Sequence, residues 1–268
     1  NLDFNTSLGY MHIAMAFTEN LHKQDLLFGS ELYADSLIII ATSYKNIPDS
    51  LGLAIYYEES ALMVFRDLYE QDPDDLRDRY VDGLLNLSNS YFKDGRVEKS
   101  IDLSKTALTI KGGNFETLLR LASYTLSQGD LKEGLKNAQK AYDIAKENKV
   151  DEDRYARACY TLSVANNMNK NPDNALEYGL LAWEIRKKQY EYEQDSEDFA
   201  ENYSTSLINL SRIFSKAKHH NIAIELLEES LSIAEELANK DPRYKVNVQR
   251  IMVSGISIHN AHVADSKE

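Results

Sequence analysis

The segment LLNLSNSYFKDGRVEKSIDLSKTAL, from Leu84 to Leu108, contains two amphipathic stretches separated by the turn sequence at Lys93–Gly95. Apolar residues recur at helical spacing on both sides of this turn. Glycine favours the left-handed backbone conformation that commonly ends a helix. The segment therefore predicts a hairpin of two helices.

The hairpin pattern recurs along the chain. Gly95 and Gly129 lie 34 residues apart, and a block of the form Gln-Asp…Tyr…Leu occurs three times, beginning at Leu21, Leu68 and Glu191. A module that recurs at this length indicates a stacked array rather than a single globular domain. Each block carries a tyrosine that is predicted to pack one hairpin on the next, namely Tyr33, Tyr80 and Tyr203.

Small residues occupy the positions where the two helices of each hairpin are expected to cross. Close approach of two helix axes needs short side chains at the crossing and large ones between crossings. In the first helices these residues are Ser88, Ala122, Ser163 and Ser211, and early in the second helices they are Ser100, Gly134, Ala175 and Ala223.

This pattern resembles the tetratricopeptide repeat family, in which a large residue is followed by Leu, a small residue, an aromatic residue, a turn glycine and small residues in the second helix. The clearest copy consists of Leu84, Leu87, Ser88, Tyr91, Gly95, Ser100 and Ala107, and the next copy of Leu118, Leu121, Ala122, Gly129, Leu131, Gly134 and Ala141. Elsewhere the repeats lengthen to 41–48 residues, which is similar to the extended repeats of kinesin light chains and of the sensor arms of large bacterial signalling ATPases. The resemblance implies an all-α, right-handed solenoid.

We expect about five hairpins with a half-repeat at each end, forming one superhelical domain over residues 1–268. Because both ends fall within a repeat, we expect the chain to be a fragment of a longer protein. The predicted segments are a trailing helix at 7–22, hairpins at 31–70, 77–111, 115–148, 152–193 and 199–240, and a last helix at 243–262. This last helix is interpreted as a truncated repeat or a cap, with Val253, Ile256 and Ser257 in the places of Leu84, Leu87 and Ser88.

Composition excludes several classes of protein. The net charge of −13 argues against a nucleic-acid binder, whose surface is basic. The longest apolar runs are far too short to span a bilayer. The single cysteine, Cys159, rules out an internal disulfide framework, favours a cytoplasmic location and is predicted to pack between helices.

No motif for catalysis, for a cofactor or for a metal is found. The chain has no phosphate-binding glycine loop, nucleophile elbow or zinc-type cysteine pair. His259 and His262 are spaced for one helix face but have no adequate third ligand. The pair at His219 and His220 is predicted to lie in a solvated turn. We therefore predict that the protein is not an enzyme and binds no cofactor or metal.

Two later turns lack glycine. Lys170 and Lys218 stand where the earlier repeats have Gly95 and Gly129. Asparagine tolerates left-handed geometry, so the neighbouring residues Asn167, Asn169 and Asn171, and His219 to Asn221, are expected to supply these turns.

In a solenoid of this type the first helices line the concave surface, where a ligand would lie. Counted from the aligned small residues, the candidate ligand-binding residues are Leu85, Asn86, Asn89, Phe92, Lys93, Leu119, Arg120, Ser123, Arg157, Tyr160, Thr161, Asn209, Arg212 and Lys216. For each of them, packing against a neighbouring helix is an equally good interpretation. Only two of five positions fit the carboxylate clamp by which some members of the family hold chaperone C-termini.

The sequence thus predicts a protein- or peptide-binding module that acts as a scaffold or sensor arm. Its ligand would be an extended segment or a helix, held by amide and guanidinium groups in an otherwise acidic protein. The alternative is a peptide-responsive regulatory domain that controls an attached DNA-binding or ATPase domain. The oligomeric state is not predicted.

Overall fold

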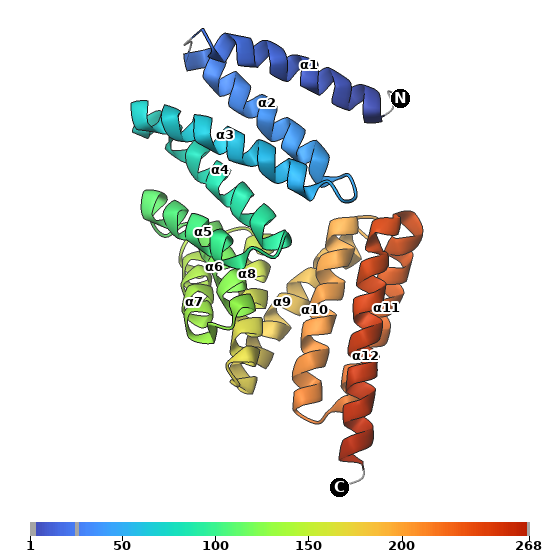
Figure 1. Cartoon of the computed structure of the whole chain (residues 1–268). Helices are drawn as coiled ribbons and strands as arrows, with labels where there is room; N and C mark the ends of the chain where they lie inside the picture. Colours follow the sequence, from blue (N-terminus) through green and yellow to red (C-terminus); the bar gives the residue numbers. More distant parts are fainter. Residues whose placement is uncertain (1–3, 25–26, 267–268) are drawn as a thin grey trace. The chain divides into compact units, whose positions relative to one another are not determined.

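The computed structural model describes residues 4–24 and 27–266, which form twelve α-helices and one short 3-10 turn without a strand (Figure 1). The all-α fold class is thereby confirmed. The helices are α1 (Phe4–His22), α2 (Leu27–Lys45), α3 (Leu51–Gln71), α4 (Pro73–Lys93), α5 (Val97–Lys111), α6 (Phe115–Gln128), α7 (Leu131–Glu147), α8 (Glu152–Met168), α9 (Pro172–Tyr192), α10 (Glu197–Lys216), α11 (His220–Lys240) and α12 (Lys245–Asp265), with the turn η1 (Pro242–Tyr244) before α12. Within the described ranges no helix is sufficiently long and apolar to traverse a bilayer.

Contacts divide the chain into two compact units, one ending at Gln128 and one beginning at Gly129. In the first unit α1 packs on α2, α2 on α3, α3 on α4, α4 on α5 and α5 on α6. In the second unit the same consecutive packing runs from α7 to α12. This order of packing is that of a tetratricopeptide-like solenoid. Most helices begin within four residues of the predicted boundaries, whereas continuity over one domain stays a prediction.

Side-chain caps fix the starts of several helices. Asp72, Asp130 and Asp151 each accept a hydrogen bond from the backbone N–H three residues later, at 3.3, 3.1 and 2.9 Å. Such caps satisfy one of the N–H groups that a helix start leaves unpaired. Pro73 takes the first position of α4, where a missing N–H does no harm.

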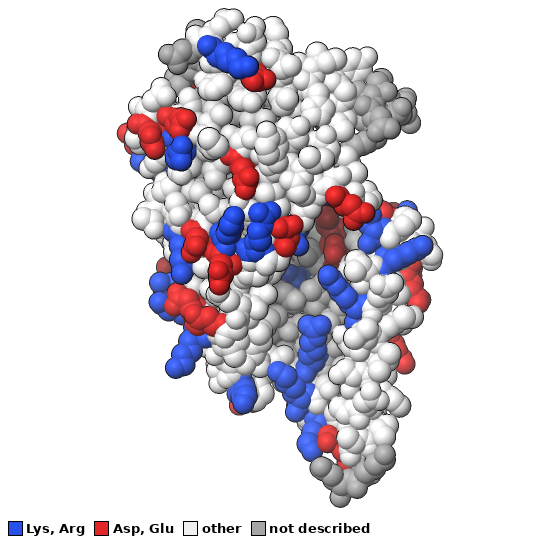
Figure 2. Space-filling view, in the orientation of Figure 1, with Lys and Arg blue, Asp and Glu red and all other residues white. Residues whose placement is uncertain are grey.

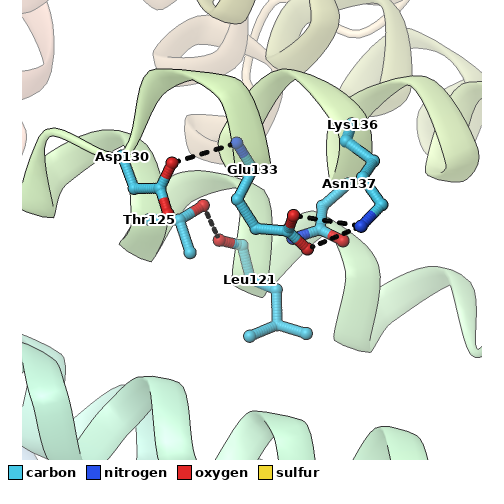
Figure 3. A network of polar contacts seen from close by, with 6 residues as sticks. All are labelled: Leu121, Thr125, Asp130, Glu133, Lys136 and Asn137. Carbon is cyan, nitrogen blue, oxygen red and sulfur yellow. Dashed lines mark hydrogen bonds and ion pairs between the residues drawn. The ribbon is translucent and has the colours of Figure 1, made fainter.

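The start of α7 illustrates this local logic (Figure 3). The Asp130 carboxylate receives the N–H of Glu133, and the Glu133 carboxylate in turn lies 3.1 Å from Nζ of Lys136. Asn137 donates to the same carboxylate at 3.5 Å. In α6, Thr125 donates to the carbonyl of Leu121 at 2.6 Å. The start of α7 is thus specified by residues only three or four positions apart.

The predicted small residues lie at the helix crossings. Ser88 Oγ donates to the carbonyl of Ser100 at 2.8 Å, and Ser163 Oγ donates to the carbonyl of Ala175 at 2.6 Å. Both serines are fully buried. A Cβ on Gly179 in α9 would stand 2.9 Å from Ser163 Oγ, so glycine is required there for close approach. Each hydroxyl satisfies a carbonyl across the hairpin, which also fixes the relative position of the two helices.

Stacked aromatic rings connect successive hairpins, as predicted for the three tyrosines of the repeated block. The ring pairs span the linker between a second helix and the next first helix. Their centroid distances are 5.3 Å for His22 and Tyr33, 5.1 Å for Tyr69 and Tyr80, and 5.3 Å for Tyr190 and Tyr203. Offset stacks of this kind contribute about 0.5–1.5 kcal/mol beyond the area that they bury.

The prediction that asparagines supply the later turns is wrong. Lys170 and Lys218 themselves adopt the left-handed conformation, with φ of 61° and 64°, where the earlier turns have Gly95 and Gly129 at 81° and 94°. The Asn169 side chain instead donates to the carbonyl of Leu131 at 2.8 Å. The lysines therefore carry a backbone strain that glycine would not.

The alignment of α12 with a first helix stays a prediction. Val253 and Ile256 are 67% and 63% exposed, whereas the aligned Leu84 and Leu87 are buried against Leu103 of α5, the second helix of their hairpin. The buried residues of α12 are Ile251 and Ile258, which pack on α11 and α10. Among the described residues no second helix follows α12, so its outer face has no such cover.

Candidate functional site

Two adjoining hollows lie along the first helices of the second unit, on α8, α10 and α12. Their volumes are about 190 and 530 Å³, and Tyr160, Arg212 and Ser254 line both. We call their combined surface the groove. The smaller hollow is lined by Tyr160, Glu201, Ser204, Thr205, Ile208, Arg212, Ala234, Leu237, Asn247, Arg250 and Ser254, and the larger by Tyr160, Val164, Asn167, Met168, Asn209, Arg212, Ser215, Lys216, Val253, Ser254, Ser257 and Ile258.

The groove is rich in cationic side chains, which gather over α10 on the face shown in Figure 2. Arg212 and Arg250 are exposed and line the same hollow from α10 and α12. Within the described part of the chain, no carboxylate lies within ion-pair distance of either guanidinium group. Glu201, the acidic residue of this hollow, accepts a hydrogen bond from Asn247 at 3.3 Å. Two guanidinium groups thus face solvent in a protein of net charge −13.

Tyr160 forms the floor shared by both hollows. The guanidinium carbon of Arg186 in α9 lies 4.7 Å from the centre of its ring. Burial raises the pKa of Tyr160, and the positive charges of Arg186 and Arg212 oppose this rise. The phenol is therefore protonated at neutral pH and can donate a hydrogen bond into the groove.

Arg186 is held behind Tyr160 rather than in the groove. It is only 4% exposed, and its Nη1 donates to the Asn202 carbonyl at 3.3 Å and to Ser206 Oγ at 3.0 Å. Burial lowers the pKa of this guanidinium group. Arg186 holds the Tyr160 ring in place and joins α9 to α10, so its role is to support the site rather than to bind a ligand.

The larger hollow combines polar and apolar surface. Lys216 Nζ donates to the carbonyl and to the side-chain oxygen of Asn167, at 3.1 and 2.8 Å, and so links α10 to α8. Val253 on α12 is 67% exposed on the opposite wall. The larger hollow thus offers both hydrogen-bonding groups and apolar surface.

The structure brings together part of the predicted ligand-binding set. Tyr160, Arg212 and Lys216 lie in the groove. Asn209 reaches its edge but is 4% exposed and donates to Ser163 Oγ at 2.8 Å, so its amide is already used within the protein. Thr161 donates to the backbone carbonyl of Arg157 at 2.9 Å, and neither of these two residues lines the groove.

The candidates of the first unit are more dispersed. Leu85 and Leu119 are each only 5% exposed, which agrees with the alternative interpretation that they pack in the core. Arg120 donates to the Leu85 carbonyl at 3.1 Å, and Phe92 stacks on Tyr124 at 4.4 Å. The remaining candidates lie at least partly exposed on α4 and α6, namely Asn86, Asn89, Lys93 and Ser123.

Sequence reasoning missed the contribution of α12. Arg250, Val253 and Ser254 line the groove but are absent from the predicted set. The only available signal is that α12 resembles a first helix, and first helices line the concave side. The alignment pairs Val253 with the buried Leu84, so Val253 is not counted among the groove residues.

The histidines form no metal site in the described part of the chain, where no group of three His, Cys, Asp or Glu side chains could hold an ion. The prediction that His220 is solvated is wrong. It is 4% exposed, and its Nε2 lies 2.9 Å from the Asp265 carboxylate and its ring 5.4 Å from that of His262. This cluster fastens the end of α12 to the start of α11. Cys159 is buried as predicted.

Comparisons with known proteins agree with this fold. Residues 204–244, which span α10 and α11, match the family model described as tetratricopeptide repeat. No curated protein sequence matches the chain.

Several solved structures share the fold. The crystal structure of BtubC (BKLC) from P. vanneervenii is similar with a TM-score of 0.69 and 17% identity, over 88% of this chain and 93% of that one. A putative kinesin light chain of Podospora anserina with nearly identical TPR-like repeats gives 0.55 and 15%, over 77% and 96%. A thermophilic TPR protein of Thermus thermophilus gives 0.51 and 14%, over 82% and 99%. At these identities the likeness establishes the fold alone.

Proposed function

We propose that this chain, which folds as a tetratricopeptide-like solenoid and matches that repeat family over residues 204–244, is a protein-binding module. The ligand would lie in the groove along α8, α10 and α12 and would be an extended segment or a helix of another protein. The role would be that of a scaffold or sensor arm. A cytoplasmic location is part of this proposal and is supported by the single, buried cysteine.

One observation carries the proposal. Arg212 and Arg250 line one hollow, and no carboxylate of the described residues pairs with them. Many exposed cations elsewhere in this acidic chain have a carboxylate within reach, as Lys188 has Glu184 at 2.8 Å. Guanidinium groups bind carboxylates in a bidentate manner. The proposed ligand therefore carries Asp, Glu or a terminal carboxylate in the hollow that both arginines line.

The surroundings of the arginines define the rest of the ligand. The protonated hydroxyl of Tyr160 and the hydroxyls of Ser254 and Ser257 offer hydrogen bonds to a backbone. Val253 and Val164 offer apolar contact for a neighbouring side chain. The expected motif is thus an acidic residue flanked by an apolar one, rather than a uniformly acidic tract.

The test uses a library of labelled dodecapeptides that contain an acidic, a neutral or a basic residue next to leucine or phenylalanine. Binding to the whole chain is measured by fluorescence anisotropy. The double variant Arg212→Glu/Arg250→Glu should lose at least about a hundredfold in affinity for acidic peptides, since a hydrogen bond to a charged group contributes about 1.5–3 kcal/mol. Raising the salt concentration should weaken binding to the native chain.

The matched control is Lys132→Glu/Lys140→Glu. Both lysines are exposed on α7, a second helix, and their reversal changes the net charge by the same amount. This control should retain acidic-peptide binding within about threefold, since long-range terms are screened by salt. Equal losses in the two double variants, or binding of basic rather than acidic peptides by the native chain, would refute the groove proposal. Far-UV circular dichroism verifies that both variants fold.

A further inference from the structure

The contact between the end of α12 and the start of α11 is made by groups that gain and lose protons. His220, the first residue of α11, is 4% exposed, and its Nε2 lies 2.9 Å from the Asp265 carboxylate. Lys218 Nζ reaches the same carboxylate at 3.3 Å from the turn before α11. The ring of His262 lies 5.4 Å from that of His220. Two imidazoles and one ammonium group thus gather around a single carboxylate.

The neutral imidazoles suit this arrangement. The hydrogen bond from His220, together with that from Lys218, lowers the pKa of Asp265, so this side chain is ionised. An ionised carboxylate only accepts hydrogen bonds, so Nε2 of His220 carries a hydrogen and donates it. Nδ1 of the same ring is buried and has no hydrogen-bond partner among the described residues. With both rings neutral, the charges of Lys218 and Asp265 offset each other.

Acid changes this balance, because histidine is the side chain whose charge ordinarily changes between pH 5 and 8. A first proton on the ring pair lies near the Asp265 carboxylate, which favours it. A second proton creates two cationic rings whose centres are 5.4 Å apart, and one of these rings is buried. Like charges at this distance disfavour the doubly protonated pair. The closed contact therefore binds about one proton fewer than two histidines in water.

The surrounding helices supply no second negative charge. Within the described ranges, Asp265 is the only carboxylate within ion-pair distance of either ring. The acidic residue that comes next along α11, Glu225, is exposed and five positions beyond His220. The remaining titratable groups near this end of the packed helices are neutral or positive, namely Lys216 on α10, which is bonded to Asn167, His219 before α11, and the exposed His259 on α12.

We propose that His220, His262 and Asp265 form a proton-operated latch, which acid opens so that the last two turns of α12 leave α11. Once the helix end has separated, each imidazole reaches water and binds a proton independently. The open state then holds about one proton more than the closed state. The equilibrium constant for opening should therefore rise by up to about tenfold for each unit by which the pH falls. Ile251, buried near the start of α12, keeps the rest of the helix on α11.

The latch lies beside one wall of the groove. Ser257 and Ile258 of α12 line the larger hollow and directly precede the turns that the latch holds. Opening would loosen this wall. If the groove binds a peptide as proposed above, on which this consequence alone rests, acid weakens that binding by displacing part of the wall.

Hydrogen–deuterium exchange with mass spectrometry measures opening on the whole chain without a ligand. The exchange rate of residues 259–266 is divided by that of an unstructured peptide of the same sequence at the same pH. From pH 7.5 to 5.5 the native chain should open at least about tenfold more. In His262→Gln the remaining imidazole can be protonated beside Asp265 in both states, so the change should stay below about threefold. The matched control, His259→Gln, removes an exposed histidine one turn away and should respond like the native chain.

The decisive quantity is the dependence of opening on pH. A purely structural role of His262 would make His262→Gln open more by the same factor at every pH, with the native slope retained, and this result would overturn the latch. Opening of the native chain that is constant or decreases toward acid would do the same, as would a slope lost equally in His259→Gln. Failure of every peptide to bind would refute the groove alone, because the exchange measurement contains no peptide.

Discussion

The ion pair between Lys45 and Glu58 offers the sharpest test of the packing in the first unit. The side chain of Glu58 is 2% exposed and that of Lys45 is 24% exposed, and the pair joins α2 to α3. The second carboxylate oxygen, Oε2, has no hydrogen-bond partner in the described structure. Lys45 is therefore the principal group that compensates a buried negative charge.

The two partners should respond differently to substitution. Lys45→Met leaves Glu58 buried and uncompensated, and removal of one partner of a buried pair costs about 3–5 kcal/mol. Because Lys45 is partly exposed, we expect a cost near the lower end, about 3 kcal/mol. Glu58→Gln leaves an ammonium group on a long stem that can turn toward water, and should cost only about 1 kcal/mol.

Urea unfolding followed by far-UV circular dichroism measures these costs. Trp183, the single tryptophan, lies in the second unit and its fluorescence reports that unit separately. The surface control is Lys111→Met, which removes the exposed pair with Asp78 and should cost less than about 1 kcal/mol. If Lys45→Met costs no more than this control, or no more than Glu58→Gln, the pair is not acting as a buried one and the reasoning is refuted.

Two further predictions concern the turns and the response to alkali. Lys170→Gly should stabilise the protein by about 0.5–1 kcal/mol in urea unfolding, because it removes a left-handed strain of about 1–2 kcal/mol and the greater unfolded-state entropy of glycine offsets only part of this gain. Lys218→Gly should gain less, since Lys218 also binds Asp265 at 3.3 Å, and a loss of stability in Lys170→Gly would contradict the strain. Burial, together with the hydrogen bond to Glu59, raises the pKa of Tyr91 from 10.0 to about 12. The stability that the neutral phenol contributes is present below about pH 10 and is lost as the pH rises through about 12. The difference in unfolding free energy between the native chain and Tyr91→Phe should therefore shrink over that interval. A difference that does not change with pH would contradict the raised pKa of Tyr91.

Most of the architecture could be predicted because its determinants are local. Helix starts depend on residues such as Asp72 and Asp151, three positions from the N–H that they cap. Hairpin crossings depend on serines twelve residues before the carbonyl that they bind. The stacked tyrosines lie one linker apart. Each of these signals falls within one repeat, so it can be recognised in the sequence of a single repeat.

The site was harder to predict because it depends on rotation about helix axes. Leu85 and Asn209 lie at the expected angle about their helix axes. Leu85 is nevertheless buried in the core, and the Asn209 amide is bonded to the Ser163 hydroxyl. In α12, Val253 is 67% exposed although its aligned position, Leu84, is covered by α5. His220 is buried by Asp265, which lies 45 residues later. No local pattern in the sequence marks these distant partners.

The stacked rings at the linkers have a consequence for how such a chain can grow by gene duplication. Each pair, such as Tyr69 with Tyr80, joins the end of one hairpin to the start of the next. A duplicated segment cut at the tight turns inside hairpins carries a complete ring pair, and the new copy can dock at once on its neighbours. A hairpin cut at both linkers, such as α2 with α3, carries Tyr33 near its start and Tyr69 near its end, so tandem copies again place two rings across the new linker. Either kind of duplication thus keeps the aromatic contact by which one hairpin attaches to the next.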